Sequence, residues 1–202
     1  MRILTYDIEI KRAILNDQPA DEFEEQYPGI EYVNTFKDFD RMGIGCLCAL
    51  DSESPLPLIY DEHNVKDFQQ AINEADVVVT YNGEGFDHRV LQASGVIVPI
   101  TKSFDLMRAI KDASSFRFSL DAMAEKNLEI RKTDSGKLAP ILWQQGQHAR
   151  VINYCLNDCL MTQELYALAK KQGYLFTPKG GKVKLFNQST AWYDRVDLQP
   201  QP

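Results

Sequence analysis

Hydrophobic residues fall in short runs in the first half of the chain and recur at helical spacing in the second half. Five runs predict β-strands, at residues 1–9, 43–50, 56–60, 76–81 and 102–104. Turn-forming residues at 51–55 join the second and third strands, so the first three strands are predicted to form a meander. The run at 76–81 is rich in valine, which is typical of a strand buried on both faces.

Apolar residues three and four positions apart predict helices, at residues 65–75, 105–111, 120–126 and 148–171. The first of these connects two predicted strands, and such a crossover leads into a parallel strand. Residues 11–40 are acidic, contain prolines and show no clear periodicity, so we expect an insertion or a long loop there. The pattern as a whole predicts an α/β protein.

Two carboxylates lie within the first predicted strand. Asp7 and Glu9 are two residues apart, so their side chains project from one face of the strand. Like charges this close in a partly dry site are unfavourable unless a hydrogen-bond donor or a divalent metal compensates them. The spacing therefore indicates a metal site at the carboxyl end of this strand.

Two other segments carry candidate ligands. Asp87 follows a strand and a glycine turn, and lies in the first turn of a helix at the sheet edge where α/β proteins bind ligands. Taken alone, Asp87 is better explained by stabilisation of the helix start than by metal binding. Tyr154 and Asp158 share a face of the long helix, one turn apart, and alone would be explained by exposure to solvent.

Taken in order, three segments resemble the motifs of the DEDD exonucleases: Tyr6–Glu9, Tyr81–Asp87 and Tyr154–Asp158. The resemblance spans about residues 2–170 and is greatest to the proofreading exonuclease domain of family B DNA polymerases. Tyr154 lies four residues before Asp158, as in the tyrosine (DEDDy) branch, whereas the position five residues before is Asn153 rather than histidine. The remaining residues are too few for a polymerase, so we expect a free-standing relative.

The resemblance implies an RNase H-like three-layer fold, with a central mixed five-stranded sheet flanked by helices. It also implies catalysis by Asp7, Glu9, Asp87, Tyr154 and Asp158. Two divalent cations, Mg²⁺ or Mn²⁺, suit these oxygen ligands. One ion would be held by Asp7, Glu9 and Asp158, and the other chiefly by Asp7 with Asp87. Tyr154 would orient the attacking water, because a phenol with a pKa near ~10 is a poor base.

Asn82 and Phe86 match positions that approach the terminal nucleotides in the family, and Ile8 and Ile10 are further candidates for substrate binding. The ring of Phe86 could stack on a base, and packing in the core explains it equally well. Ile10 stands where polymerase relatives commonly have threonine, so a hydroxyl contact is not expected there.

The C-terminal part, outside the resemblance, predicts a hairpin at 174–186 with a basic tip. We expect Lys179, Lys182 and Lys184 to hold a phosphate backbone, although a hairpin that merely stabilises the body is equally compatible. The expected organisation is one exonuclease domain at 1–172 with a hairpin and tail at 173–202 packed on it.

Composition narrows the function classes. The chain has 202 residues, 44% hydrophobic and 25% charged, which suits one globular domain. Its net charge of −7 argues against a protein that coats DNA without sequence preference. No apolar run approaches the ~20 residues of a membrane span, and acidic residues occupy the place of a signal-peptide core. We therefore expect a soluble, cytoplasmic protein with no membrane partner.

The cysteines offer a second metal hypothesis. Cys46 and Cys48 are predicted on one strand face, and Cys155 and Cys159 on one helix face, so a zinc site is formally open. Their spacing lacks a zinc knuckle and favours reduced thiols in the core.

The leading functional prediction is a metal-dependent 3′–5′ exonuclease acting on single-stranded DNA. RNA trimming stays open, because the motifs contact phosphate and do not report a 2′-hydroxyl. The alternative from another class is a catalytically weak module that binds nucleic-acid ends or a replication partner. The sequence leaves the oligomeric state open.

Overall fold

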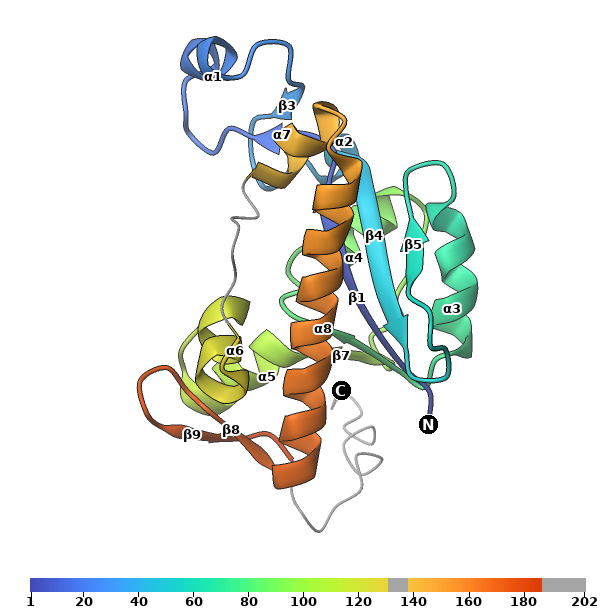
Figure 1. The fold of residues 1–202 in the computed structure, drawn as a ribbon, viewed down its shortest axis with the longest axis vertical. Helices are drawn as coiled ribbons and strands as arrows, with labels where there is room; N and C mark the ends of the chain where they lie inside the picture. The colour runs from blue at the N-terminus through green and yellow to red at the C-terminus, as the bar shows by residue number, and fades with distance from the viewer. Residues whose placement is uncertain (131–137, 187–202) are drawn as a thin grey trace, which may run out of the picture.

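A mixed five-stranded sheet forms the centre of the protein, as Figure 1 shows for the computed structural model, which describes residues 1–130 and 138–186. The strand order is β5-β4-β1-β6-β7. The strands are β1 (Ile3–Ile10), β4 (Ile44–Asp51), β5 (Leu58–Tyr60), β6 (Val77–Thr80) and β7 (Ser103–Asp105). Strand β4 pairs antiparallel with both β1 and β5. On the other side, β6 pairs in parallel with β1, and β7 pairs in parallel with β6. The predicted α/β fold with an N-terminal meander is confirmed.

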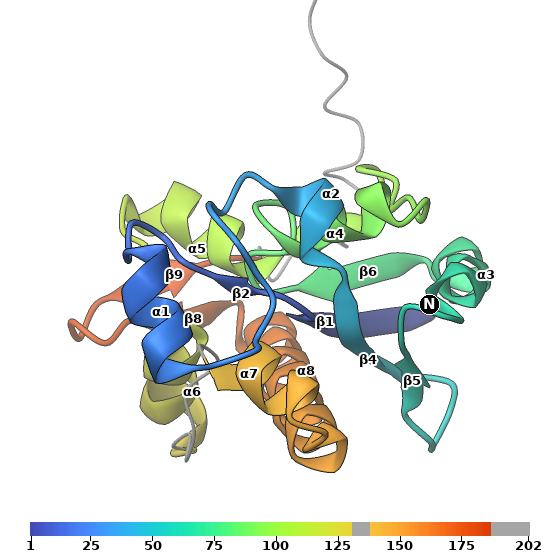
Figure 2. The same cartoon turned by 90° about the horizontal axis from the view of Figure 1, so that it is seen from above.

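Helices cover both faces of this sheet. The helices are α3 (Phe68–Glu74), preceded by the 3₁₀ turn η1 (Val65–Asp67), and α4 (Asp87–Ala93), α5 (Leu106–Ser114), α6 (Leu120–Leu128), α7 (Ala139–Gln144) and α8 (His148–Gln172). Figure 2 shows α4 and α8 on opposite sides of the sheet, which gives three layers. The long helix α8 ends at Gly173, whose φ of 82° suits glycine at a helix C-terminus.

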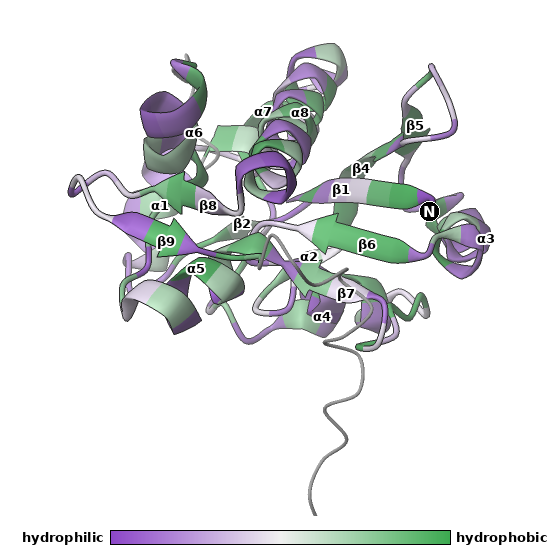
Figure 3. Cartoon of the chain, turned by 90° about the horizontal axis from the view of Figure 1, so that it is seen from below, coloured by the Kyte–Doolittle hydropathy of each residue, from purple (hydrophilic) through white to green (hydrophobic). Residues whose placement is uncertain are grey.

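Alternation along β1 divides its residues between the two layers. Leu4, Tyr6 and Ile8 are buried in the cluster that includes residues of α3 and α4. On β6, Val77 and Val79 enter a second cluster with residues of α5, α6 and α8. Figure 3 shows the hydrophobic residues along β6 and the first part of β1. Because side chains alternate along a strand, the residues of β1 between those in the first cluster project toward α8.

The predicted insertion at 11–40 has secondary structure of its own, so the long-loop interpretation is wrong. It contains β2 (Ala13–Ile14), α1 (Ala20–Gln26), β3 (Tyr32–Val33) and α2 (Phe39–Met42). Strands β2 and β3 pair in parallel. Leu15 and Phe23 are buried together with Ile141 of α7, so a small satellite core fixes the insertion to the body.

The C-terminal hairpin is formed by β8 (Tyr174–Phe176) and β9 (Lys182–Lys184), and it packs on the body. Leu175 and Val183 are buried in the cluster that contains residues of α8. The Asn127 side chain donates to the Phe176 carbonyl and accepts from the Phe176 N–H, both at 2.8 Å. The predicted tail at 187–202 lies outside the described residues. Across both described ranges, no helix combines the length and apolar character needed to cross a bilayer.

Candidate metal centre and nucleic-acid site

Strand β1 presents Asp7 and Glu9 on the α8 side of the sheet. Their neighbours Tyr6 and Ile8 point into the opposite core, and the alternation of the strand turns both carboxylates toward the helix. Glu9 is only 8% exposed. Asp7 is half-buried, so the strand places two carboxylates side by side where water is partly excluded, and their charges require compensation.

A β-bulge lies beside Glu9. In the pairing of β1 with β4, Glu9 faces Cys46 and Ile10 faces Ile44, so Gly45 is the extra residue. A Cβ on Gly45 would lie 3.1 Å from both the Glu9 carbonyl and the ring of Trp143, so a larger residue would be crowded there. Bulges change the direction of side chains next to them, and this one lies where Glu9 leaves the regular strand.

Asp158 of α8 completes a group of three carboxylates. Oxygen atoms of Asp7, Glu9 and Asp158 all lie within 4.8 Å of one another. Helix α8 is held against the strand at this level, because the Cys155 thiol donates to the Asp7 carbonyl at 3.3 Å. The helix can approach closely because its facing residues, Cys155 and Cys159, are small and fully buried. Three of the four predicted metal ligands therefore converge, although they come from opposite ends of the chain.

The fourth predicted ligand, Asp87, is attached to the backbone of β1. It is the first residue of α4 and is 6% exposed. Its carboxylate accepts a hydrogen bond at 3.1 Å from the N–H of Ile8, the residue between Asp7 and Glu9. Asp87 is thus next to the group of three without belonging to it.

The loop before Asp87 is held by Asp105, a residue to which the sequence assigned no role. Its carboxylate accepts from the backbone N–H groups of Asn82 at 2.9 Å and Glu84 at 3.1 Å. It also accepts at 3.1 Å from the backbone N–H of Arg108, in the first turn of α5. An acid at the end of a strand and before a helix could have identified only the bond to Arg108, which caps the helix.

Burial and mutual repulsion disfavour the charged forms of these acids. Burial is the main cause that raises the pKa of Asp7 well above its ordinary value, and Asp87, Asp158 and Glu9 raise it further. Burial also raises the pKa of Asp87 to about 7, although hydrogen bonds from two backbone N–H groups favour its charged form. Hard oxygen donors that repel one another fit a divalent cation such as Mg²⁺ or Mn²⁺, which would reverse this penalty.

The proposed water-positioning residue, Tyr154, is half-buried on α8 one turn before Asp158. Residues four apart on a helix share a face, so Tyr154 lies on the side of α8 that carries the carboxylate.

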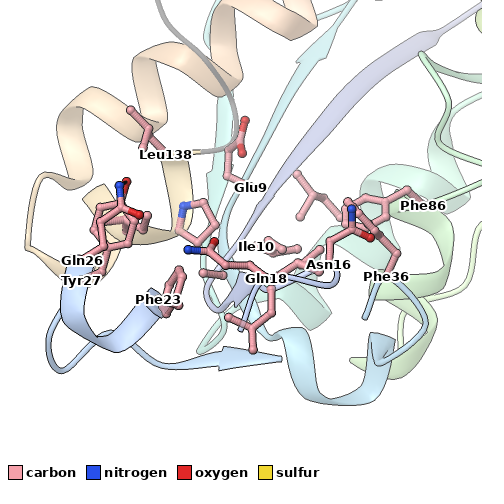
Figure 4. A pocket seen from close by; sticks show the side chains of 16 residues that line it. Glu9, Ile10, Asn16, Gln18, Phe23, Gln26, Tyr27, Phe36, Phe86 and Leu138 are labelled. Carbon is pink, nitrogen blue, oxygen red and sulfur yellow. Dashed lines mark hydrogen bonds between the residues drawn. The ribbon is translucent and has the colours of Figure 1, made fainter. Parts of the chain in front are cut away.

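Three of the predicted substrate-binding residues line a cavity, whereas Asn82 is not among its lining residues. Ile8, Ile10 and Phe86 line it together with Glu9, and its volume is about 730 Å³. Figure 4 shows Glu9 at one side of this cavity and Phe86 at another. Phe86 also meets Phe39 edge-on at 5.9 Å between ring centroids, so it packs in the core and faces the cavity. Asn82 is half-buried in the loop before Asp87, with a φ of 68°.

Much of the cavity wall comes from the insertion. The sequence analysis expected an insertion here but did not predict that it lines a cavity. Asn16, Gln18, Phe23 and Phe36 contribute to the lining. Two-residue strands and a seven-residue helix are too short to give a periodic signal, so the sequence offered little to detect this wall.

The lysines of the hairpin lie apart from the carboxylates. The hairpin begins where α8 ends, and the helical rise puts that point about 20 Å along the axis from Asp158. The Nζ atom of Lys179 lies 3.7 Å from the ring centroid of Phe116, and that of Lys182 lies 4.2 Å from the ring centroid of Tyr174. Lys184 is exposed. The structure therefore does not bring these lysines to the carboxylates.

All four cysteines are buried thiols. The sulfur atoms of Cys46, Cys48 and Cys155 lie within 4.8 Å of one another. Cys159 donates to the Cys48 carbonyl at 3.1 Å. These contacts place the cysteines between α8 and β4, and reduced core thiols stay our prediction for them.

Comparison with known proteins agrees with this geometry. Residues 57–170, more than half of the chain, match the model of a family described as the RNase H superfamily. The matched range includes Asp87 and Asp158, whereas Asp7 and Glu9 precede it. No curated protein matches the chain.

Among solved structures, the family B DNA polymerase from the hyperthermophilic archaeon Pyrobaculum calidifontis is similar, with a TM-score of 0.57 and 20% sequence identity. The similarity covers 85% of this chain and 24% of the polymerase chain, and at this identity it shows a shared fold. Together with the mixed sheet and its flanking helices, the match to the family shows that this chain belongs to the RNase H superfamily.

Proposed function

We propose that the protein is a metal-dependent nuclease that removes nucleotides from the 3′ end of a nucleic acid, with single-stranded DNA as the preferred substrate. The observation that carries the proposal is the group of three carboxylates, Asp7, Glu9 and Asp158, whose oxygen atoms lie within 4.8 Å. Membership of the RNase H superfamily supports nucleic-acid hydrolysis. The preference for a 3′ end follows from the resemblance of the three motifs to the DEDD exonucleases.

The residues fit two divalent cations. Asp7, Glu9 and Asp158 would hold one, and Asp7 with Asp87 would hold the other, since Asp87 is linked to the same strand through the Ile8 N–H. When bound, such ions neutralise charge on the scissile phosphate and promote deprotonation of the attacking water.

The protein's own groups have separate tasks. Asp105 fixes the loop that ends in Asp87, and the strand β1 fixes the spacing of Asp7 and Glu9. Tyr154 supplies a hydroxyl on the same helix face as Asp158. Its role is to hold the attacking water by a hydrogen bond, because a phenol is mostly protonated at neutral pH.

The test follows single-stranded DNA, duplex DNA and RNA, each labelled at the 5′ or the 3′ end, with Mg²⁺, Mn²⁺ or a chelator. We expect a 5′-labelled single strand to shorten stepwise and a 3′ label to leave first as a mononucleotide, only with metal. Cuts inside the strand, or activity that persists in chelator or in Asp7→Ala, would contradict the proposal. Preferential degradation of RNA would change the substrate and leave the chemistry in place.

A further inference from the structure

All four cysteines of the chain lie in one hydrophobic cluster between β4 and α8. Cys46 and Cys48 come from the strand, whereas Cys155 and Cys159 come from the helix, far later in the chain. Each of the four is fully buried. Other small apolar residues would fill this space as well, so the convergence of every cysteine points to the chemistry of sulfur.

The thiols of β4 lie beside the carboxylates of β1. In the pairing of the two strands, Cys48 faces Asp7 and Cys46 faces Glu9. Residues directly opposite each other in an antiparallel pair project from the same face, so thiols and carboxylates all lie on the α8 side of the sheet. This interface therefore holds two sets of donors side by side, hard oxygen atoms on β1 and soft sulfur atoms on β4.

Three of the sulfur atoms form a compact group. Those of Cys46, Cys48 and Cys155 all lie within 4.8 Å of one another. Three thiolates that bind an ion in one plane at ~2.3 Å, the length of a zinc–thiolate bond, keep their sulfur atoms about 4 Å apart. The three side chains therefore need only small movements to close on one ion. The cysteines lack the spacing of a zinc knuckle, but a site built from a strand and a helix does not depend on that spacing.

The surroundings of the group determine how many ligands an ion would have. Cys159 lies in the cluster but outside the group of three, and its thiol donates to the Cys48 carbonyl at 3.1 Å. Partly buried hydrophobic side chains pack around the cluster: Leu50, Leu142, Trp143, Ile152 and Leu156. A hydrophobic shell limits the access of water to a metal ion, so we expect three ligands and no bound water. Structural zinc sites almost always have four ligands, whereas Cu⁺ selects soft sulfur ligands and accepts three.

We propose that Cys46, Cys48 and Cys155 bind one Cu⁺ ion between β4 and α8. Reduced thiols are the form that binds such an ion, and those that bind it lose their protons. The ion would join the strand that pairs with β1 to the helix that carries Asp158. The site is independent of the proposed nuclease centre, because thiolates select a soft ion and carboxylates select Mg²⁺ or Mn²⁺.

Copper content and affinity test the inference. The three ligands are fully buried, so the ion should enter as α8 packs on the sheet during folding. We therefore expect protein purified anaerobically from cells grown with added copper to hold one Cu⁺ ion per chain by native mass spectrometry. Competition with the chelator bicinchoninate should show that Cys48→Ser lowers the affinity about 100-fold or more, because loss of an outer-shell partner alone costs about 10–100-fold.

Two further variants keep the test specific. Cys48→Ala introduces no buried hydroxyl and should lose copper as Cys48→Ser does. Cys159→Ser, in the same cluster but outside the group of three, is the matched control and should bind Cu⁺ as the parent does. Circular dichroism should show that all three variants are folded.

Thermal unfolding gives a second readout. Copper-loaded parent and Cys159→Ser should have a Tm about 5 °C or more above that of their copper-free forms, because an ion bound only by the folded state stabilises it. Cys48→Ala should show no such rise. Protein without copper, or equal copper in the parent and Cys48→Ala, would overturn the site. Zinc in place of copper, or a disulfide found as a mass two hydrogen atoms below that of the reduced chain, would overturn it as well.

Discussion

At the scale of single residues, the site brings together acidic side chains that are largely buried. Glu9, Asp87 and Asp158 are 8%, 6% and 7% exposed. Acids in such surroundings are normally neutralised or paired, so their presence together indicates a function that outweighs the cost. Tyr154 differs from them, because it is half-buried and carries a hydroxyl in place of a carboxylate.

Two substitutions should separate these roles. Asp7→Ala removes a ligand common to both proposed ions and should lower the single-turnover rate by about 10³-fold or more, since such ions supply several kcal/mol. Tyr154→Phe removes one hydroxyl worth roughly 0.5–1.5 kcal/mol and should lower the rate by about twofold to tenfold. Single-turnover cleavage of a labelled strand measures both. Equal losses in the two variants would contradict the division between metal binding and water positioning.

At the scale of elements, the junction between β6 and α4 positions Asp87. Asn82 has a φ of 68°, and a Cβ on Gly83 would lie 2.3 Å from Oγ1 of Thr80 and 2.5 Å from its Cβ. Thr80 is fully buried in the strand, so it has little freedom to move away. The tight turn therefore requires glycine, and Asp105 fixes its backbone from the neighbouring strand.

Gly83→Ala should destabilise the protein by about 1–3 kcal/mol, because the added methyl group overlaps a buried side chain. Gly181→Ala is a matched control, since the nearest atom to its added Cβ would be 3.4 Å away. This control should change stability by no more than about 0.5 kcal/mol. Urea unfolding followed by circular dichroism measures both free energies. Indistinguishable unfolding midpoints for the two variants would show that the junction tolerates a side chain.

Elements with a strong period could be predicted, and short elements could not. The five strands and the long helix α8 lie within a few residues of their predicted bounds, because burial imposes a period on each of them. Helix α7 was missed, since it has six residues and contains Pro140. The sequence motifs identified the acids that converge. The bulge at Gly45 and the hydrogen bonds from Asp105 to the loop before Asp87 could not be predicted, because they depend on neighbours distant in the chain.

At the scale of the whole molecule, the raised pKa values connect metal binding to stability. Between the ordinary value of 3.8 and the folded-state pKa of about 7, Asp87 binds more protons in the folded than in the unfolded chain. Asp7 shifts in the same direction. Stability contributed by these groups is therefore greatest at low pH and falls as pH rises through this window. A divalent cation should oppose the fall by stabilising the charged carboxylates.

The Tm of the chain in chelator should decrease between pH 5 and pH 8, and the decrease should be smaller in Asp87→Asn, whose side chain does not ionise. Addition of Mn²⁺ should raise Tm more at pH 8 than at pH 5, because protons no longer compete for the ligands. Differential scanning calorimetry at both pH values measures these shifts. The same dependence on pH in the parent and in Asp87→Asn would mean that Asp87 titrates at its ordinary pKa.

The most direct test of the metal centre is a calorimetric titration of the purified protein with Mn²⁺ at pH 8, in the presence of a nucleoside 5′-monophosphate. Two ions should bind per chain, and Asp7→Asn should abolish binding of at least one while the variant stays folded by circular dichroism. An absence of Mn²⁺ binding, or equal binding by the parent and Asp7→Asn, would contradict a centre built from the acids of β1, α4 and α8.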